Sequence, residues 1–413
     1  MEIWPVLILS LVFLTNAFAQ RPSDASILDR KLSQGYDWRQ RPTPDPRSGP
    51  ADGPTRVAVN LYLRRLGLAD NVLDAEITFR QEWNDTHLDY SRDYGGAAPP
   101  YVHIHPLDKT ERRIWTPDTF FQNAYDLQIQ NLPSPNELLR IHKNGAVLSS
   151  QKLSFKANCP MTYAAYPNDR QICHFDLASY AYTTSDIVYE WKGNASGTPP
   201  VQVKSGLEHS IPGFLLENVT TGYCTSKTST GTYSCLRASL TFKRLPSSLS
   251  SSKLYLIPLV LALLSLLPMI INAQSIIVRV VIGFFCLTTL ILHWSIIDEE
   301  LPKASYTTGA DVWLTRCLGF IVATLIQLIF YVWIVRATTA YKERKLAKQR
   351  VAKEKLIVAR KEGTEDEEIV LIHPQEPLVP ERKLGISLLV DLISLAIFVL
   401  VFLVFLLYYF TKY

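Results

Sequence analysis

The chain has 413 residues, of which 47% are hydrophobic, and a formal net charge of +4. Its length suits two or three ordinary soluble domains, but the mean hydropathy of +0.06 conceals two unlike parts. Apolar residues concentrate after Tyr255, whereas the preceding part is mixed, aromatic-rich and full of turn residues. The small positive balance comes from one late segment, which excludes any general argument from charge for nucleic-acid binding.

The first 20 residues have the pattern of a cleaved secretory signal. An apolar run from Val6 to Leu14 is followed by the small-x-small ending Ala17-Phe18-Ala19. No Lys or Arg precedes the run, which leaves an N-terminal membrane anchor as the alternative. Because the run is short for a membrane span, we expect export, with residues 1–20 as the signal peptide.

The polar part that follows is predicted to form mainly strands. Ser23 to Ser33 predicts a short amphipathic helix, and a proline-rich extended stretch runs from Arg41 to Pro54. From Arg56 to Arg244, short runs alternate apolar and polar residues between Pro, Gly, Asn and Asp, which is typical of antiparallel strands in a sandwich. The clearest runs are RVAVNLYL, DAEITFRQEW, GAVLSSQKLSF, RQICHFDLASY, DIVYEWK and RASLTFKR.

The cysteines agree with export. Four of the six lie in the polar part, where oxidising conditions would let two close pairs form disulfides. These pairs are Cys159/Cys173 and Cys224/Cys235. The other two, Cys286 and Cys317, lie in apolar runs and are expected to be buried free thiols. The polar part also holds three glycosylation sequons, at Asn84, Asn194 and Asn218.

The second part of the chain contains four apolar stretches. Each has about the 20 residues that a helix needs to cross a bilayer. The stretches are Leu254–Ala273, Ser275–Ile297, Asp311–Val335 and Leu384–Tyr409. Only a few residues separate the first two, so these must form a tight hairpin on one side of the membrane.

A polar loop between the third and fourth stretches orients the chain. Within Arg336–Lys383, the segment Lys342–Lys361 has nine Lys/Arg against two Glu, and the positive-inside rule places such a loop in the cytosol. Four crossings then put both termini outside, in agreement with the signal, the sequons and the cysteine pairs. The basic segment is either a specific lipid or partner site or a solvated amphipathic helix on the anionic inner leaflet.

These patterns predict a multi-pass plasma-membrane protein of the α+β class, an extracellular antiparallel β-sandwich followed by a four-helix transmembrane bundle. The expected parts are the signal peptide (1–20), the extracellular β-sandwich domain (21–246), transmembrane helices 1–3 (247–335), the cytoplasmic loop (336–383) and transmembrane helix 4 (384–413).

One cysteine pair encloses a motif of high specificity. Cys159 and Cys173 enclose 13 residues around the sequence Tyr166-Pro167-Asn168-Asp169. Closed by a disulfide and turned by proline, this would be a stiff protruding loop, and it resembles the signature loop of the pentameric Cys-loop receptors. Trp115-Thr116-Pro117-Asp118 and Trp83 resemble two further motifs of these ligand-gated channels. The resemblance implies four further subunits, of the same kind in a homopentamer or of related kinds.

The second cysteine pair stands where that family has a flexible flap over the agonist site. Asp176–Val188 and Tyr223-Cys224-Thr225-Ser226 resemble the glutamate-gated chloride channels. Those channels hold their ligand with two arginines on strands of one subunit and with hydroxyl and aromatic residues of its neighbour. The resemblance assigns ligand binding to Arg64, Arg80, Ser150, Ser179, Tyr180, Thr230 and Tyr233.

These residue types suit a small amino-acid agonist. Arginine forks bind a carboxylate in bidentate geometry, and an ammonium group prefers the faces of tyrosines such as Tyr180 and Tyr233. The alternative is that they are surface arginines and ordinary strand tyrosines. We expect a small anionic amino acid, glutamate first.

The resemblance also implies a path by which closure of the flap reaches the pore. It runs through the lower loops, although Arg244 has simple interfacial anchoring as an alternative role. The residues on this path are Asp70, Tyr166, Pro167, Asp169, Arg244, Pro302 and Lys303.

The second crossing lines the pore in this family, and here the sequence departs from the anion-channel pattern. Ile277-Val278 replace the family's Pro-Ala before Arg279, and the glutamate of cation channels is also missing. Five copies of Phe285 would form an apolar ring, and such constrictions gate by dewetting. Helical spacing places six residues on the pore face, namely Val281, Phe285, Thr288, Leu292, Ile296 and Glu299.

Charges at the two ends of this helix give opposite indications. The carboxylates of Asp298, Glu299 and Glu300 at the outer mouth would concentrate cations, whereas Arg279 at the inner end favours anions. Thr288 stands where the family has its mid-pore leucine. This replacement would move the barrier of the closed pore to another position and would not remove it.

We therefore expect a homopentameric channel opened by glutamate or a similar small amino acid, passing chloride by family analogy. The alternative is a ligand-binding subunit that conducts poorly alone or passes cations, and acts in heteromers. An enzyme has little support, because His293 stands alone in an apolar helix without a second ligand or base. The expected partners are the subunits, the agonist, membrane lipid and the permeant ion. We expect no nucleic acid, cofactor, metal or catalytic residue.

Overall fold

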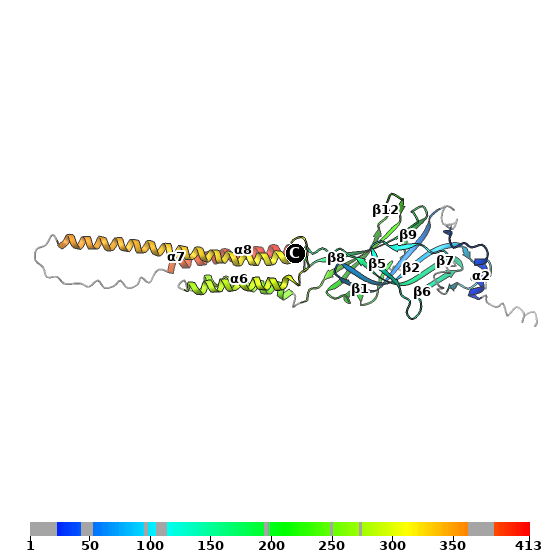
Figure 1. Ribbon diagram of the computed structural model, residues 1–413, viewed down its shortest axis with the longest axis horizontal. Coiled ribbons are helices and arrows are strands. Elements are labelled where there is room, and N and C mark those ends of the chain that lie inside the picture. The colour runs from blue at the N-terminus through cyan, green and yellow to red at the C-terminus, as the bar shows by residue number, and fades with distance from the viewer. Residues whose placement is uncertain are drawn as a thin grey trace, which may run out of the picture. The chain divides into compact units, whose positions relative to one another are not determined.

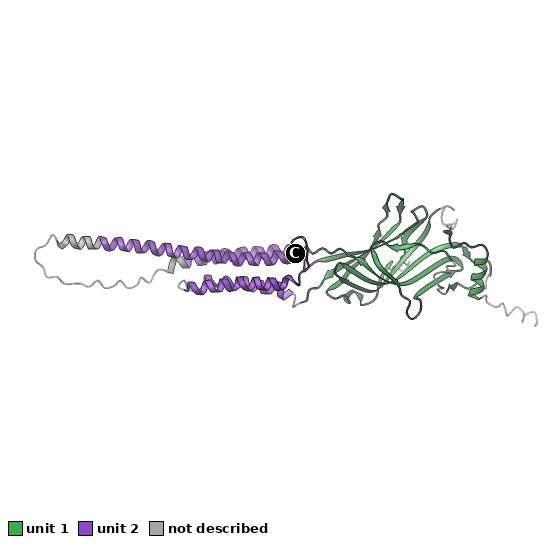
Figure 2. Cartoon of the chain, in the orientation of Figure 1, with its two compact units in different colours: residues 1–162, 170–245 green, residues 163–169, 246–413 purple. Residues whose placement is uncertain are grey.

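The computed structural model describes residues 23–42, 53–94, 98–104, 114–193, 197, 199–247, 251–271, 275–361 and 384–413, with side chains left out at 352–361 and 384–387. The chain forms two compact units (Figure 2), residues 1–162 with 170–245 and residues 163–169 with 246–413, here called the sandwich unit and the helical unit. The predicted signal peptide, the sequon at Asn194 and residues 362–383 of the predicted loop lie outside the described residues.

The first described helix, α2 (Asp24–Ser33), confirms the helix expected there. The Ser23 hydroxyl caps it by accepting a hydrogen bond from the backbone N–H of Ser26 at 3.2 Å. Ile27 is buried in the core of the sandwich unit, and Lys31 pairs with Asp93 at 2.7 Å. An apolar face and an ion pair thus hold this helix to the sheets.

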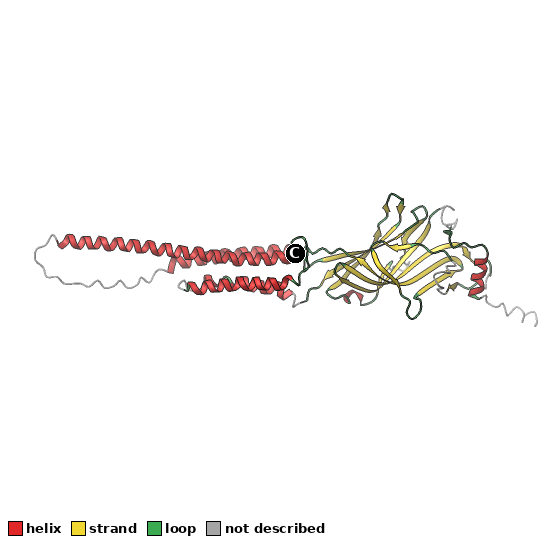
Figure 3. Ribbon diagram, viewed as in Figure 1, coloured by secondary structure: helices red, strands yellow, loops and turns green. Residues whose placement is uncertain are grey.

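The larger sheet of the sandwich unit contains eight strands (Figures 1 and 3). They are β1 (Thr55–Ala69), β2 (Val72–Asp89), β3 (Tyr101–Ile104), β5 (Ala124–Ile129), β6 (Glu137–His142), β7 (Asn144–Asn158), β9 (Ile187–Trp191) and β10 (Val201–Val203). Their order is β10-β1-β2-β7-β6-β3, with β5 also paired to β7 and β9 to β1.

The smaller sheet has four strands and carries a separate hairpin. The four are β4 (Thr119–Phe121), β8 (Arg170–Ser179), β11 (Phe214–Tyr223) and β14 (Cys235–Arg244), in the order β11-β14-β8-β4. The hairpin consists of β12 (Ser226–Lys227) and β13 (Thr232–Tyr233), and a short 3-10 turn, η2, spans Leu207–His209.

Alternating burial explains why these runs form strands. In β1 the side chains of Val57, Val59, Leu61 and Leu63 are fully buried, while the residues between them face outward, so one face of the strand builds the core. All six clear alternating runs of the sequence are strands. The sandwich is antiparallel as predicted, except that β9 and β10 run parallel to β1.

Both predicted disulfides are present, Cys159–Cys173 and Cys224–Cys235, and the two remaining cysteines are buried free thiols as expected. The indole rings of Trp83 and Trp115, both buried, meet edge to face with 5.9 Å between their centroids. Trp83 and Trp115 therefore lie in the core of the sandwich unit, whereas Tyr166 to Asp169 of the first disulfide-closed loop belong to the helical unit.

The helical unit begins with a broken first crossing. It consists of a π-helical turn, η3 (Ser252–Leu256), then α4 (Ile257–Leu264) and α5 (Leu267–Ile270). Pro258 and Pro268 stand in the first turns of α4 and α5, where a missing backbone N–H is tolerated. The other helices are α6 (Ile276–Asp298), α7 (Gly309–Lys361) and α8 (Leu384–Lys412).

The four predicted crossings are confirmed as helices. Among the residues that the structure describes, four helical segments are long and apolar enough to cross a membrane, at residues 252–270, 276–298, 309–351 and 388–412. Between α6 and α7 the packing is close, because an added Cβ at Gly283 would collide with Leu325.

The third helix differs from its predicted length. Instead of ending at Val335, α7 continues without a break to Lys361 (Figure 1). The basic segment is therefore a continuation of the third crossing and not a separate helix. Its sequence explains this, since no Gly or Pro occurs between Arg336 and Lys361 and strong helix formers dominate. At about 1.5 Å per residue, this continuation adds about 39 Å of helix.

Candidate ligand-binding surfaces and pore helix

The first candidate surface lies on β1 and β2 and contains two arginines. Arg64 is exposed at a bulge in β1, where its Nε donates to Thr78 Oγ1 at 2.6 Å. The ring of Tyr62 lies beneath it, with 5.4 Å from guanidinium carbon to ring centroid. A neutral hydroxyl and an aromatic face therefore position this cation.

Arg80 on β2 is held in a similar way. Its Nη1 donates to Asn60 Oδ1 at 3.1 Å, and Asn60 Nδ2 in turn donates to the carbonyl of Pro200 at 2.9 Å. Ser150 of β7 lies opposite Arg80 in the sheet register, and both side chains are half-buried. Neither Arg64 nor Arg80 has an acidic partner among the residues that the structure describes.

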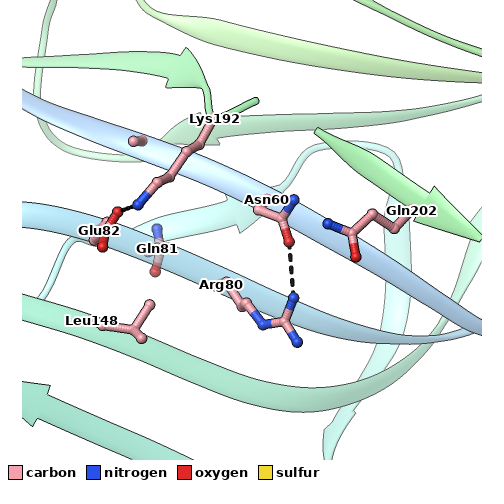
Figure 4. A pocket seen from close by; sticks show the side chains of 8 residues that line it. Asn60, Arg80, Gln81, Glu82, Leu148, Lys192 and Gln202 are labelled. Carbon is pink, nitrogen blue, oxygen red and sulfur yellow. Dashed lines mark hydrogen bonds and ion pairs between the residues drawn. The ribbon is translucent and has the colours of Figure 1, made fainter. Parts of the chain in front are cut away.

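Arg80 also lines an open pocket of about 200 Å³ (Figure 4). The Lys192 ammonium pairs with Glu82 at one end of it, and burial lowers the pKa of Lys192. Of the seven residues predicted to bind ligand, Arg80 alone belongs to this lining. The lining residues are Ala58, Asn60, Arg80, Gln81, Glu82, Leu148, Lys192 and Gln202.

The second candidate surface lies around the hairpin β12–β13, which the Cys224–Cys235 disulfide closes. Thr230 Oγ1 and the hydroxyl of Tyr233 are hydrogen-bonded at 2.9 Å. The side chain of Tyr180 is 77% exposed, with its ring edge on Phe120 at 5.4 Å between centroids. Tyr233 is half-buried, and the ring faces of such tyrosines suit a cationic group.

Ser179 does not fit the role of a direct side-chain contact. It is 3% exposed, its hydroxyl donates to Asp118 Oδ1 at 2.6 Å, and it accepts from the backbone N–H of Tyr182 at 2.9 Å. Asp118 Oδ2 also accepts from the N–H of Ala181 at 2.7 Å. Ser179 and Asp118 therefore fix the loop that presents Tyr180.

The two surfaces belong to different sheets, and no described hydrogen bond joins them. Arg64, Arg80 and Ser150 lie on the larger sheet, whereas Ser179 ends β8 of the smaller sheet and Tyr180 follows it. Sequence reasoning missed Asn60 and Thr78, which position the arginines, and Tyr223, which is 67% exposed at the base of the flap. Alternation placed Asn60 on the outward face of β1, but only the structure gives its partner.

The predicted pore face of α6 is exposed along its length. Val281, Phe285, Leu292 and Ile296 are each 60 to 66% exposed, and Thr288 and Glu299 are exposed too. The opposite face packs inward through Gly283, Cys286, Leu290 and Ile297. His293, predicted to stand alone, donates from Nε2 to the carbonyl of Lys253 in the π-helical turn at 2.9 Å.

The acidic cluster at the end of α6 is partly neutralised within the chain. Asp298 pairs with Lys303 at 2.7 Å and Glu300 with Lys253 at 3.0 Å. Glu299 has no ion pair among the described residues. One carboxylate per chain, not three, is therefore uncompensated at this end.

Arg279, which was expected to favour anions in the pore, does not lie on the exposed face of α6. Its side chain is 2% exposed and is paired with Asp391 at 2.9 Å. A buried and neutralised guanidinium cannot act on a passing ion as a bare charge would.

The residues predicted to couple the flap to the pore are divided between the two units. In the sandwich unit, Asp70 adopts a φ of 48° in the β1–β2 turn, and the guanidinium of Arg244 lies 4.5 Å from the ring centroid of Phe214. Tyr166, Pro167, Asp169, Pro302 and Lys303 belong to the helical unit. There, the N–H of Tyr163 donates to the hydroxyl of Tyr306 at 2.8 Å.

Comparison with known proteins identifies the family. Residues 25–246 match the family model described as the neurotransmitter-gated ion-channel ligand binding domain. The chain is 37% identical over 334 residues to the glutamate-gated chloride channel subunit beta of Haemonchus contortus, covering 80% of this chain and 74% of that protein. It is 33% identical over 380 residues to the glutamate-gated chloride channel of Drosophila melanogaster, covering 88% and 80%.

The matched region contains the sheets, disulfides and candidate surfaces described above, and the two alignments, of 334 and 380 residues, are longer than that region. This family consists of ligand-gated ion channels and not of enzymes. The chain therefore belongs to the neurotransmitter-gated ion channels of the Cys-loop class, as a multi-pass plasma-membrane subunit with an extracellular N-terminal sandwich domain.

Proposed function

We propose that this chain forms a homopentameric chloride channel that opens when glutamate, or a similar small amino acid, binds between neighbouring subunits. Both named relatives are glutamate-gated chloride channels. At 33 to 37% identity the ligand and the ion require support from the site itself.

The observation that carries the proposal is the state of Arg64 and Arg80. Both lack a carboxylate partner among the described residues, and each is braced by neutral groups, Thr78 for one and Asn60 for the other. The adjacent Arg65 differs, because it pairs with Asp74 at 3.3 Å. A ligand carboxylate would supply the missing partner in bidentate geometry.

The neighbouring subunit would complete the site with its flap. Tyr180 and Tyr233 would receive the ammonium group on their ring faces, and Thr230 would close over the ligand. Ser150 would add a hydroxyl beside Arg80. We assign Ser179 a loop-positioning role, since its hydroxyl is already hydrogen-bonded to Asp118.

In the proposed pore, α6 lines the ion path. Five Phe285 rings and the apolar side chains of Leu292 and Ile296 would keep the closed pore dry. Movement of the flap would reach this helix through the coupling residues, which are Asp70, Tyr166, Pro167, Asp169, Arg244, Pro302 and Lys303.

One observation favours a second candidate, a subunit that passes cations or conducts poorly alone and acts in heteromers. Arg279 is buried and paired, while Glu299 at the other end of α6 is exposed and unpaired among the described residues. The proposed pore face then carries no exposed basic side chain, and five copies of Glu299 would form one ring of carboxylates that attracts cations.

Expression of this chain alone in cells without other receptors of the class tests the proposal. Glutamate, glycine, GABA and biogenic amines are applied in turn while whole-cell current is recorded and surface protein is measured. The proposal predicts a current with glutamate or another small amino acid. Full surface expression without any agonist-evoked current would overturn it in favour of the heteromeric candidate.

A further inference from the structure

An ion pair is buried among the membrane helices. Arg279, in the first turn of α6, is 2% exposed, and Asp391 of α8 is 6% exposed. The two form a bidentate pair, with Nη2 to Oδ2 at 2.9 Å and Nη1 to Oδ1 at 3.3 Å. Ionisable residues inside membrane helices are rare and usually pair in this manner.

The guanidinium of Arg279 also contacts the two remaining membrane crossings, the first and the third. Its Nη2 also donates to the carbonyl of Ile271, just after α5. On another side lies the ring of Tyr331 of α7, with 4.7 Å from guanidinium carbon to ring centroid. One residue of the pore helix thus bonds to the end of the first crossing, stacks on the third and pairs with the fourth.

Because both charges are buried, replacing only one residue of the pair is expected to destabilise the protein. Loss of one partner leaves the other charge buried and uncompensated, which is strongly destabilising, whereas neutral replacement of both partners is often tolerated. A surface pair has no such property, because water solvates whichever charge remains.

We propose that Arg279 and Asp391 form a four-helix lock that fixes the cytosolic end of the pore helix, and that Arg279 takes no part in ion selection. In this account Arg279 is a positioning residue, and the lipid-facing helix α8 sets the geometry of the inner pore through Asp391. The inference does not depend on which agonist opens the channel or which ion passes.

A double-mutant cycle in the full-length chain tests the lock. We expect Arg279→Gln and Asp391→Asn, each alone, to lower surface protein and the yield of detergent-solubilised pentamer by about fivefold or more. The double variant should recover most of the loss. A matched bidentate pair on the surface, Arg170 and Glu217 at 2.7 Å, should show single effects that are small and simply additive.

Two results would overturn the lock: single variants as abundant as the unmodified chain, or losses in the double variant that equal the sum of the single ones. Ion selection is read separately, from the reversal potential of the double variant. We expect the unmodified value, and a shifted value with intact pentamers would show that the Arg279 charge acts on ions.

Discussion

At Arg80, a neutral side chain fixes the orientation of a cation that has no acidic partner among the described residues. Asn60 links its guanidinium to the carbonyl of Pro200 through two hydrogen bonds of 3.1 and 2.9 Å. An aspartate at this position would have the same shape but would compete with a ligand carboxylate. The charge at residue 60 is therefore expected to matter as much as its hydrogen bonds.

We predict that Asn60→Ala raises the agonist concentration for half-maximal current by about three- to tenfold, since one positioning bond is worth about 1 kcal/mol. Asn60→Asp should raise it further, because its carboxylate neutralises Arg80. Concentration–response curves at matched surface expression measure both effects. Equal sensitivity of Asn60→Asp and the unmodified channel would exclude this role.

The two candidate arginines have an internal control in their neighbour. Arg64→Ala and Arg80→Ala should each raise the concentration of a carboxylate agonist needed for half-maximal current by about 100-fold, because a charge-assisted bidentate contact is lost. Arg65→Ala should change it little, because its surface pair with Asp74 contributes little. Similar losses for all three variants would point to a general effect on folding instead.

At the scale of elements, we propose that α6 carries the barrier that closes the pore. Phe285 is 60% exposed on the face that would line the pore, and an apolar ring excludes water from a narrow passage. Phe285→Ser should therefore produce current without agonist, at unchanged surface expression. The leak is measured as holding current before any agonist is applied. A silent Phe285→Ser channel that still opens with agonist would place the barrier elsewhere.

The elements differ in how far the sequence could predict them. Apolar alternation predicted β1, β2, β7, β8, β9 and β14, and hydropathy predicted all four crossings, because both patterns are local. Strand direction is not encoded in alternation, so the parallel pairing of β9 and β10 with β1 was not predicted. Hydropathy also ends with the apolar run and could not show that α7 continues to Lys361.

The site residues show the same limit. Arginines and tyrosines were found from motifs, but their supporting partners lie on other strands. The family resemblance placed Arg279 at the inner end of the pore, yet its partner Asp391 is 112 positions away in the chain. That Arg279 is buried and paired could not be predicted without that contact.

At the scale of the whole molecule, export and topology can be tested by glycosylation. Asn218 is exposed on β11 and Asn84 is half-buried on β2. We predict that Asn218→Gln removes one glycan from the surface protein, seen as a mobility shift that disappears after glycosidase treatment. No glycosidase-sensitive mass on the unmodified chain would leave the extracellular location of these sequons without support.

The most direct test of the central claim is the reversal potential of the agonist-evoked current in cells that express this chain alone. We predict that it shifts by about 59 mV for a tenfold change in chloride and does not respond to replacement of sodium by a large organic cation. A reversal potential that follows sodium and ignores chloride would contradict the proposed anion channel.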